Sequence, residues 1–335
     1  MGGVPSAGVA LSSTDVFFAG VSSTRKTHVC VRSKHRVPIA GIEDCVLTTN
    51  LMGATMTMKT ILIPTENDRS IQSALETALL LARRCDSYME GFALRSGISE
   101  LVGVDAVGVS LKTYKRDIPE EAEQSREMFE SFMQTHDVPR STGRAGLLSF
   151  GWLDDAPAGD SFVGSYGRVF DVIVMSRSDG SSTVLHNRAI ETVLFESGRP
   201  ILLSPASPPR QIATHVLVAW NCSTEQARAT ALAMSLLQQA NRVTVLTVTG
   251  GTGVPGPTAK QMVRYLQHNG VAAEPLTIEL NGRNTGEAIL ATADSLGCDL
   301  LIKGAYTQSR LRQMLFGGAT QHVLANAALP VLMAH

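Results

Sequence analysis

The chain has 335 residues, a length that suits two domains of about 150 residues each. With 44% apolar and 18% charged residues, its composition is that of a globular protein. Lys and Arg number 29 against 30 Asp and Glu, so the net charge of −1 excludes the basic excess that nucleic-acid binding uses. Because no apolar run reaches about 18 residues, we also expect no membrane-spanning helix.

The first 57 residues show no sustained helical or strand periodicity, and three interpretations of them stay open. The segment is a disordered extension, or a targeting peptide, because five basic residues between Arg25 and Arg36 meet one acid before residue 43. Alternatively it is translated upstream sequence, because Met52, Met56 and Met58 directly precede a strand pattern. We place no fold there.

Two stretches of the remaining chain share one pattern, a short apolar strand followed by a helix whose apolar residues recur at i, i+3, i+4 and i+7. Ser223 and Gln226 have the spacing of a capping box at the start of the second helix. In the first stretch we expect a strand at Thr60–Pro64 and a helix at 71–85. In the second we expect a strand at His215–Ala219 and a helix at 226–240.

The two copies also end alike. Phe170–Ser176 matches Cys298–Gly304, and Arg199–Leu203 matches Leu329–Met333. Further helices are expected between these strands. Apolar strands alternating with helices predict parallel sheets covered on both faces. We expect one domain over 58–205 and another over 210–335, joined by the linker Ala206–Pro209. A further helix is expected in each domain, at 119–136 and at 257–268.

Ligands of open parallel sheets bind beyond the carboxyl ends of the strands, which here directs attention to the loops after the first and fourth strands of each copy. In the second copy, glycines let the backbone approach a ligand, and the helix beginning near Gly318 presents unpaired N–H groups to an anion. The predicted binding residues are Ala219, Trp220, Asn221, Lys303, Gly304, Thr307, Arg310, Gly317, Gly318, Ala319 and Thr320.

Structural roles for these residues stay open beside that interpretation. The glycines also suit a turn and a close helix–sheet contact, Asn221 suits a helix cap, and Lys303 suits the exposed end of a strand. Gly250–Pro257 is rejected as a phosphate loop, because Pro257 stands where that loop needs Lys. In the first copy we expect Glu66 and Asp68 to be solvated loop carboxylates.

No catalytic motif is recognisable, and we expect no enzymatic activity, with slow nucleotide hydrolysis the one reaction left open. The histidines are isolated in the sequence, and we expect His186, His215 and His322 to be structural or exposed. The five cysteines are odd in number and form no CxxC pair, so neither a disulfide framework nor a metal site is predicted. A reducing, cytoplasmic setting follows.

The layout of both copies resembles a tandem universal stress protein over about residues 59–335. Nucleotide-binding members of that family close with G-x2-G-x9-G-(S/T) before a helix and a final strand. The second copy keeps this spacing from Gly304 to Gly318, with Thr307 in place of the second Gly and Gly318 in place of Ser or Thr. Asn221 stands where the family has an acid after the first strand.

The resemblance implies two Rossmann-like α/β domains, each a five-stranded parallel sheet with helices on both faces, packed as an intramolecular pseudo-dimer. It implies a stress-response protein that binds ATP or a related adenine nucleotide in the second domain. The alternative is a nucleotide-free tandem protein that acts as a protein-interaction module; its protein partners, and a further homodimer, stay open. The first site is expected to be lost, because Ala189 and Ile190 stand at the positions of Gly317 and Gly318.

The two departures from the family's glycine signature generate the first prediction. The change Thr307→Gly with Gly318→Ser should tighten ATP binding about tenfold or more, because it removes a β-branched residue and adds a phosphate hydrogen-bond donor. Calorimetric titration of the variant and the unmodified chain with ATP measures the difference. Undetectable binding in both proteins would favour the interaction module.

Overall fold

The computed structural model describes residues 58–66, 70–95, 111–177, 184–251, 253–305 and 318–335. The first half contains β1 (Thr60–Thr65), α1 (Ile71–Cys85), β2 (Tyr88–Ala93), α3 (Leu111–Thr135), β3 (Ser149–Trp152), α4 (Asp160–Tyr166), the 3-10 turn η1 (Gly167–Val169), β4 (Val172–Ser176), α5 (Val184–Glu196) and β5 (Ile201–Ser204). The second half contains β6 (His215–Ala219), α6 (Thr224–Leu232), α7 (Met234–Gln239), β7 (Arg242–Thr249), α8 (Ala259–His268), β8 (Ala273–Glu279), α9 (Thr285–Ser295), β9 (Leu300–Gly304), α10 (Gly318–Asn326) and β10 (Val331–Ala334). Among these helices, none combines the length and the apolar character that crossing a membrane requires.

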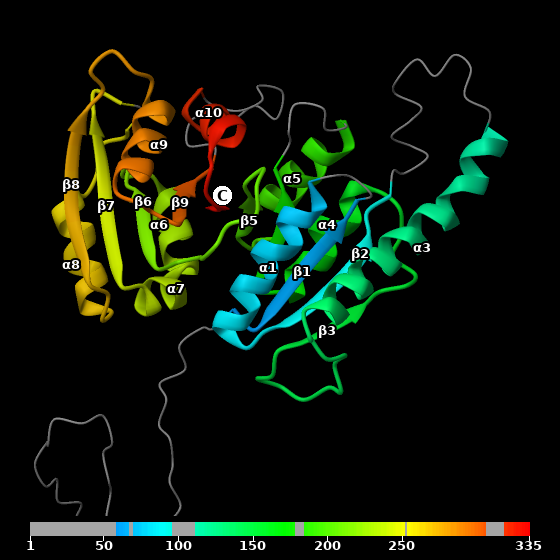
Figure 1. Ribbon diagram of the computed structural model, residues 1–335. Helices are drawn as coiled ribbons and strands as arrows, with labels where there is room; N and C mark the ends of the chain where they lie inside the picture. The colour runs from blue at the N-terminus through cyan, green and yellow to red at the C-terminus, as the bar shows by residue number, and fades with distance from the viewer. Residues whose placement is uncertain (1–57, 67–69, 96–110, 178–183, 252, 306–317) are drawn as a thin grey trace, which may run out of the picture. The chain divides into compact units, whose positions relative to one another are not determined.

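The strands of the two halves form one ten-stranded sheet in the order β3-β2-β1-β4-β5-β10-β9-β6-β7-β8 (Figure 1). Within each half all neighbours are parallel, and the order is that of a doubly wound sheet. The halves meet where β5 and β10 pair antiparallel, with Val331 opposite Leu203 and Met333 opposite Ile201. The predicted fold class is therefore confirmed.

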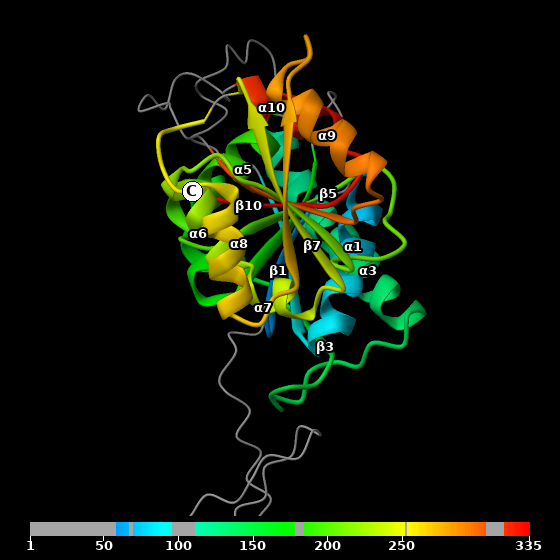
Figure 2. The same ribbon diagram turned by 90° about the vertical axis from the view of Figure 1, so that its left-hand side faces the viewer.

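Each face of the sheet is covered by its own set of helices, because successive strand residues point to opposite sides. In β1, Ile61 and Ile63 belong to the core beneath α1 and α3, whereas Leu62 belongs to the core beneath α4 and α5. The second half repeats this division. Figure 2 shows α8 and α9 on opposite sides of β7 and β8.

An aspartate repeated in both halves ties the fourth strand of each sheet to the first. Asp171 precedes β4 and accepts hydrogen bonds from the backbone N–H groups of Lys59 and Thr60 at 2.8 and 3.0 Å. Asp299 precedes β9 and accepts from Thr214 and His215, at 2.8 and 3.0 Å to Oδ1. Two backbone donors at the start of the first strand thus receive a charged acceptor in each half.

The structure corrects two helix predictions. The single helix expected over 226–240 is two helices, α6 and α7, interrupted at Ala233, whose φ of −88° and ψ of 3° lie outside the helical region. The apolar stripe survives because Ala229, Ala233 and Leu236 are all buried, so periodicity alone does not reveal the interruption. Helix α3 begins at Leu111 rather than near Pro119.

The repeated aspartate yields a stability prediction. Asp299→Ala should lower the free energy of unfolding by about 3 kcal/mol, because two backbone N–H groups lose their charged acceptor at a site 8% exposed. Asp294→Ala, an exposed position on α9, is the matched control and should change it by less than about 0.5 kcal/mol. Urea denaturation measures both. Equal losses would show that the Asp299 carboxylate has no special role.

Candidate functional site

A cavity of about 180 Å³ opens in the second half at the carboxyl ends of β6 and β7, beside the first turns of α9. This is the edge of the sheet at which the topology predicts a ligand. Its walls are mainly apolar. The lining residues are Ala219, Trp220, Asn221, Cys222, Leu246, Thr247, Val248, Gly253, Val254, Thr285 and Ile289.

Residues 253–257, from the glycine-rich segment after β7, form part of the cavity wall and fold onto the loop after β6. Trp220 Nε1 donates to the Pro257 carbonyl at 2.7 Å, and the Val254 N–H donates to the Asn221 carbonyl at 3.1 Å. A Cβ built on Gly256 would lie 2.8 Å from the Cβ of Cys222, so the close approach needs glycine there. We rejected this segment as a phosphate loop but missed its role as a wall, for which its glycine content was the available signal.

Thr247 is the lining residue whose hydroxyl lacks a partner. Its Oγ1 is buried and makes no hydrogen bond within the described residues. Because successive strand residues point to opposite faces, this hydroxyl lies on the other face of β7 from Leu246 and Val248. Sequence reasoning missed Thr247, because it lies in the middle of an apolar strand pattern.

Lys303 is buried rather than exposed, which contradicts the interpretation of this residue as a surface strand end. Its side chain is 7% exposed, and Nζ donates to the Gly304 carbonyl and to Thr320 Oγ1, each at 2.9 Å. Burial lowers the pKa of Lys303 to about 8. The amine therefore sits under the first turn of α10, on the same face of the sheet as the cavity.

Gly304 is required by packing between β9 and α6. A Cβ on it would lie 2.4 Å from the backbone nitrogen of Gln226, and its own N–H donates to Gln226 Oε1 at 2.7 Å. This favours the close helix–sheet contact for Gly304. The capping box is correspondingly half formed: Ser223 accepts from the Gln226 N–H at 3.1 Å, but the Gln226 side chain is used in the core.

The remaining predicted site residues fall into three groups. Asn221 lines the cavity, and its Oδ1 accepts from the Ser223 N–H at 3.2 Å, so Ser223 and not Asn221 caps α6. Gly318 and Ala319 begin α10, where Gly318 is exposed. The positions of Thr307, Arg310 and Gly317 lie outside the described residues, and so does that of Asp68 in the first half.

The corresponding strand ends of the first half are joined by side chains of the protein. Buried His186 donates from Nε2 to the Ser176 carbonyl at 2.9 Å, and its Nδ1 lies 3.1 Å from Glu66 Oε2. Glu66 is 18% exposed, so the expectation of a solvated carboxylate was wrong. Glu66 and Ser176 occupy the positions of Asn221 and Gly304 in the repeat, so this edge differs chemically between the halves.

No group of three His, Cys, Asp or Glu side chains in the described parts of the chain is arranged to hold a metal ion. The groups that the second half places near this edge of the sheet are a mainly apolar cavity and the buried ammonium group of Lys303.

Comparison with known proteins points to one family. Its model, described as the universal stress protein family, matches residues 213–335. No curated protein sequence matches the chain. A solved universal stress protein from Archaeoglobus fulgidus DSM 4304 is 15% identical with a TM-score of 0.65, over 83% of this chain and 96% of that one. This likeness shows a shared fold across both halves.

Shorter structures match parts of the chain. The universal stress protein UspA from Lactobacillus plantarum is 16% identical with a TM-score of 0.32, over 38% of this chain and 100% of that one. A universal stress protein family member from Burkholderia pseudomallei is 21% identical with a TM-score of 0.23, over 28% and 82% of the two chains.

Two glycines of the predicted site should respond oppositely to alanine. Gly304→Ala should lower the free energy of unfolding by about 2 kcal/mol, because the new methyl group would displace α6 from β9. Gly318→Ala should leave it unchanged or raise it by up to about 1 kcal/mol, because none of the described residues lies within 4 Å of the added Cβ. Thermal unfolding followed by circular dichroism tests the pair. A loss of similar size in both variants would contradict the packing role of Gly304.

Proposed function

We propose that the chain, whose residues 213–335 belong to the universal stress protein family, is a stress-response protein that binds an adenine nucleotide in its second half. The cavity at the ends of β6 and β7 takes the base, and the start of α10 takes the phosphates. The observation that carries the proposal is this mainly apolar cavity, whose Leu246, Val248 and Ile289 lie on the same face of the sheet as α10.

The size and lining of the cavity suit a flat heterocycle. Its 180 Å³ is below the roughly 300–1,000 Å³ of pockets that enclose whole drug-sized ligands, so it accommodates a base rather than a complete nucleotide. Leu246, Val248 and Ile289 offer apolar contact to the ring faces. Asn221 and Thr285 place polar side chains at the edge of the same cavity.

The start of α10 suits an anion. The unpaired N–H groups of a helix N-terminus attract negative charge, and α10 runs from Gly318 to Asn326. Lys303 adds a positive charge beneath its first turn, where Nζ contacts Thr320. A phosphate bound there would compensate the buried ammonium and favour its protonated form.

The proposal assigns the nucleotide to the second half alone. In the first half, His186 connects Glu66 with the end of β4, and the Glu66 carboxylate would repel a phosphate. The second candidate, a nucleotide-free interaction module, is favoured by one observation: Gly304 is needed for packing whether or not a ligand binds.

ATP binding near pH 8 tests the proposal through proton uptake. Because burial lowers the pKa of Lys303 to about 8, the free amine is partly deprotonated there, and phosphate binding should draw in a proton. Calorimetry of the full chain in two buffers of different ionisation enthalpy should reveal that uptake. Lys303→Met should abolish it, whereas Lys260→Met, at an exposed position of α8, should leave it unchanged.

The base contact is tested separately. Ile289→Ala should weaken ATP binding about five- to tenfold and leave inorganic triphosphate binding unchanged, because the Ile289 side chain contacts only the base. Absence of binding by ATP, ADP and AMP at pH 7 and pH 8 would reject the nucleotide site and leave the interaction module.

A further inference from the structure

A second cavity lies in the first half, on the opposite face of the sheet from the cavity at β6 and β7. It has a volume of about 260 Å³ and lies between α3 and the carboxyl ends of β2 and β3. Trp152 forms one apolar wall, and the small side chains of Ala93, Ala122 and Ala156 leave the space open. Trp152 packs on Phe129 of α3, which assigns the cavity to the α1 and α3 face.

Arg95 contributes a guanidinium group to the lining of this cavity, and its Nε–H is unused. Its Nη2 donates to the Ala156 carbonyl, while its Nε is buried and has no hydrogen-bond partner in the described part of the chain. The backbone holds the residue in place, because the Gly159 N–H donates to the Arg95 carbonyl at 2.8 Å. A fixed, buried Nε–H without an acceptor indicates a position where a ligand oxygen would bind.

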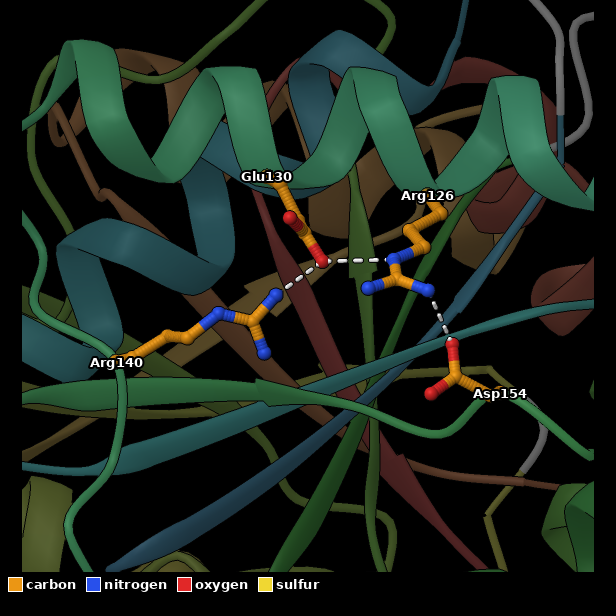
Figure 3. A network of polar contacts seen from close by, with 4 residues as sticks. All are labelled: Arg126, Glu130, Arg140 and Asp154. Atoms are coloured by element: carbon orange, nitrogen blue, oxygen red, sulfur yellow. Dashed lines mark hydrogen bonds and ion pairs between the residues drawn. The ribbon is translucent and has the colours of Figure 1, made fainter.

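The other charges near the cavity largely compensate one another. Arg126 of α3 donates from Nε to Glu130 at 2.9 Å and from Nη1 to Asp154 at 2.7 Å, and Glu130 also accepts from Arg140 (Figure 3). Burial alone would raise the pKa of Glu130, but the hydrogen bonds from Arg140 and Arg126 outweigh it and keep the pKa low. Two arginines and two carboxylates thus form a neutral network.

The charge balance selects the kind of anion. With the network neutral, the charge left inside the cavity is that of Arg95, and exposed Glu123 stands at the rim. A monoanion compensates Arg95, whereas a dianion would leave an excess negative charge beside Glu123. The indole wall and the alanines suit an apolar body, and the volume lies below that of pockets for drug-sized ligands.

We propose that this cavity is a binding site for a small organic monocarboxylate, whose carboxylate accepts from Arg95 Nε and whose apolar body lies against Trp152. The site is independent of the proposed nucleotide site, because the two cavities share no residue and lie on opposite faces of the sheet.

The two tryptophans of the chain provide separate reporters for the two cavities, since Trp152 lines one and Trp220 the other. The full chain labelled with 5-fluorotryptophan is titrated with benzoate and followed by fluorine NMR, with the resonances assigned from Trp152→Phe and Trp220→Phe. Benzoate should shift the Trp152 resonance saturably and leave that of Trp220 unchanged. Neutral benzamide and dianionic phenyl phosphate should bind at least about tenfold more weakly.

Two substitutions and a control test whether benzoate binding depends on Arg95. Arg95→Gln should weaken benzoate binding about tenfold or more, whereas Arg264→Gln, an exposed arginine on α8, should not change it. Ala122→Leu fills the cavity from α3 without altering Arg95 and should also abolish binding. The proposal is overturned if benzoate leaves the Trp152 resonance unchanged, or if benzamide or phenyl phosphate binds as tightly as benzoate. It is also overturned if Arg95→Gln or Ala122→Leu is folded and binds benzoate with full affinity.

Discussion

The antiparallel pairing of β5 with β10 is the contact on which the association of the two halves depends. Both strands are four residues long and fully buried, and each would otherwise leave an apolar edge with unpaired backbone groups. Around this pairing, Arg177 of the first half donates to the Ala327 carbonyl just beyond α10. A cation at that end of α10 complements the helix dipole, whose opposite end is the proposed phosphate site.

Comparison of the two halves separates what the fold needs from what a ligand needs. Asp171 and Asp299 occupy equivalent positions and make equivalent bonds, because every copy of this sheet must satisfy the first backbone donors of its first strand. The strand ends obey no such constraint. Glu66 has a histidine partner in one half, whereas Asn221 borders an open cavity in the other. At this pair of positions the two halves differ, at the edge of the sheet where ligands of parallel sheets bind.

The fold could be predicted from the sequence because its signals are local. The apolar strands of four to six residues and the repeated Phe170–Ser176 and Cys298–Gly304 runs need no knowledge of contacts. The site depends on distances between remote segments. Gln226 approaches Gly304 across 78 residues of sequence, and Lys303 is buried only because Thr320 and α10 cover it. A strand-end lysine looks the same in sequence whether it is exposed or covered.

Lys303 is buried and Arg95 is partly buried, and neither has a carboxylate partner in the described residues. Lys303 pairs with a carbonyl and a hydroxyl, and Arg95 with a carbonyl, so each cation relies on dipoles rather than on a carboxylate in the described residues. Dipoles compensate burial of a charge incompletely. Folding alone gives no reason to keep such cations, because an apolar residue of similar size would fill either place at lower cost. An anion that binds at these positions supplies that reason, and each half then has its own ligand chemistry on its own face of a shared sheet.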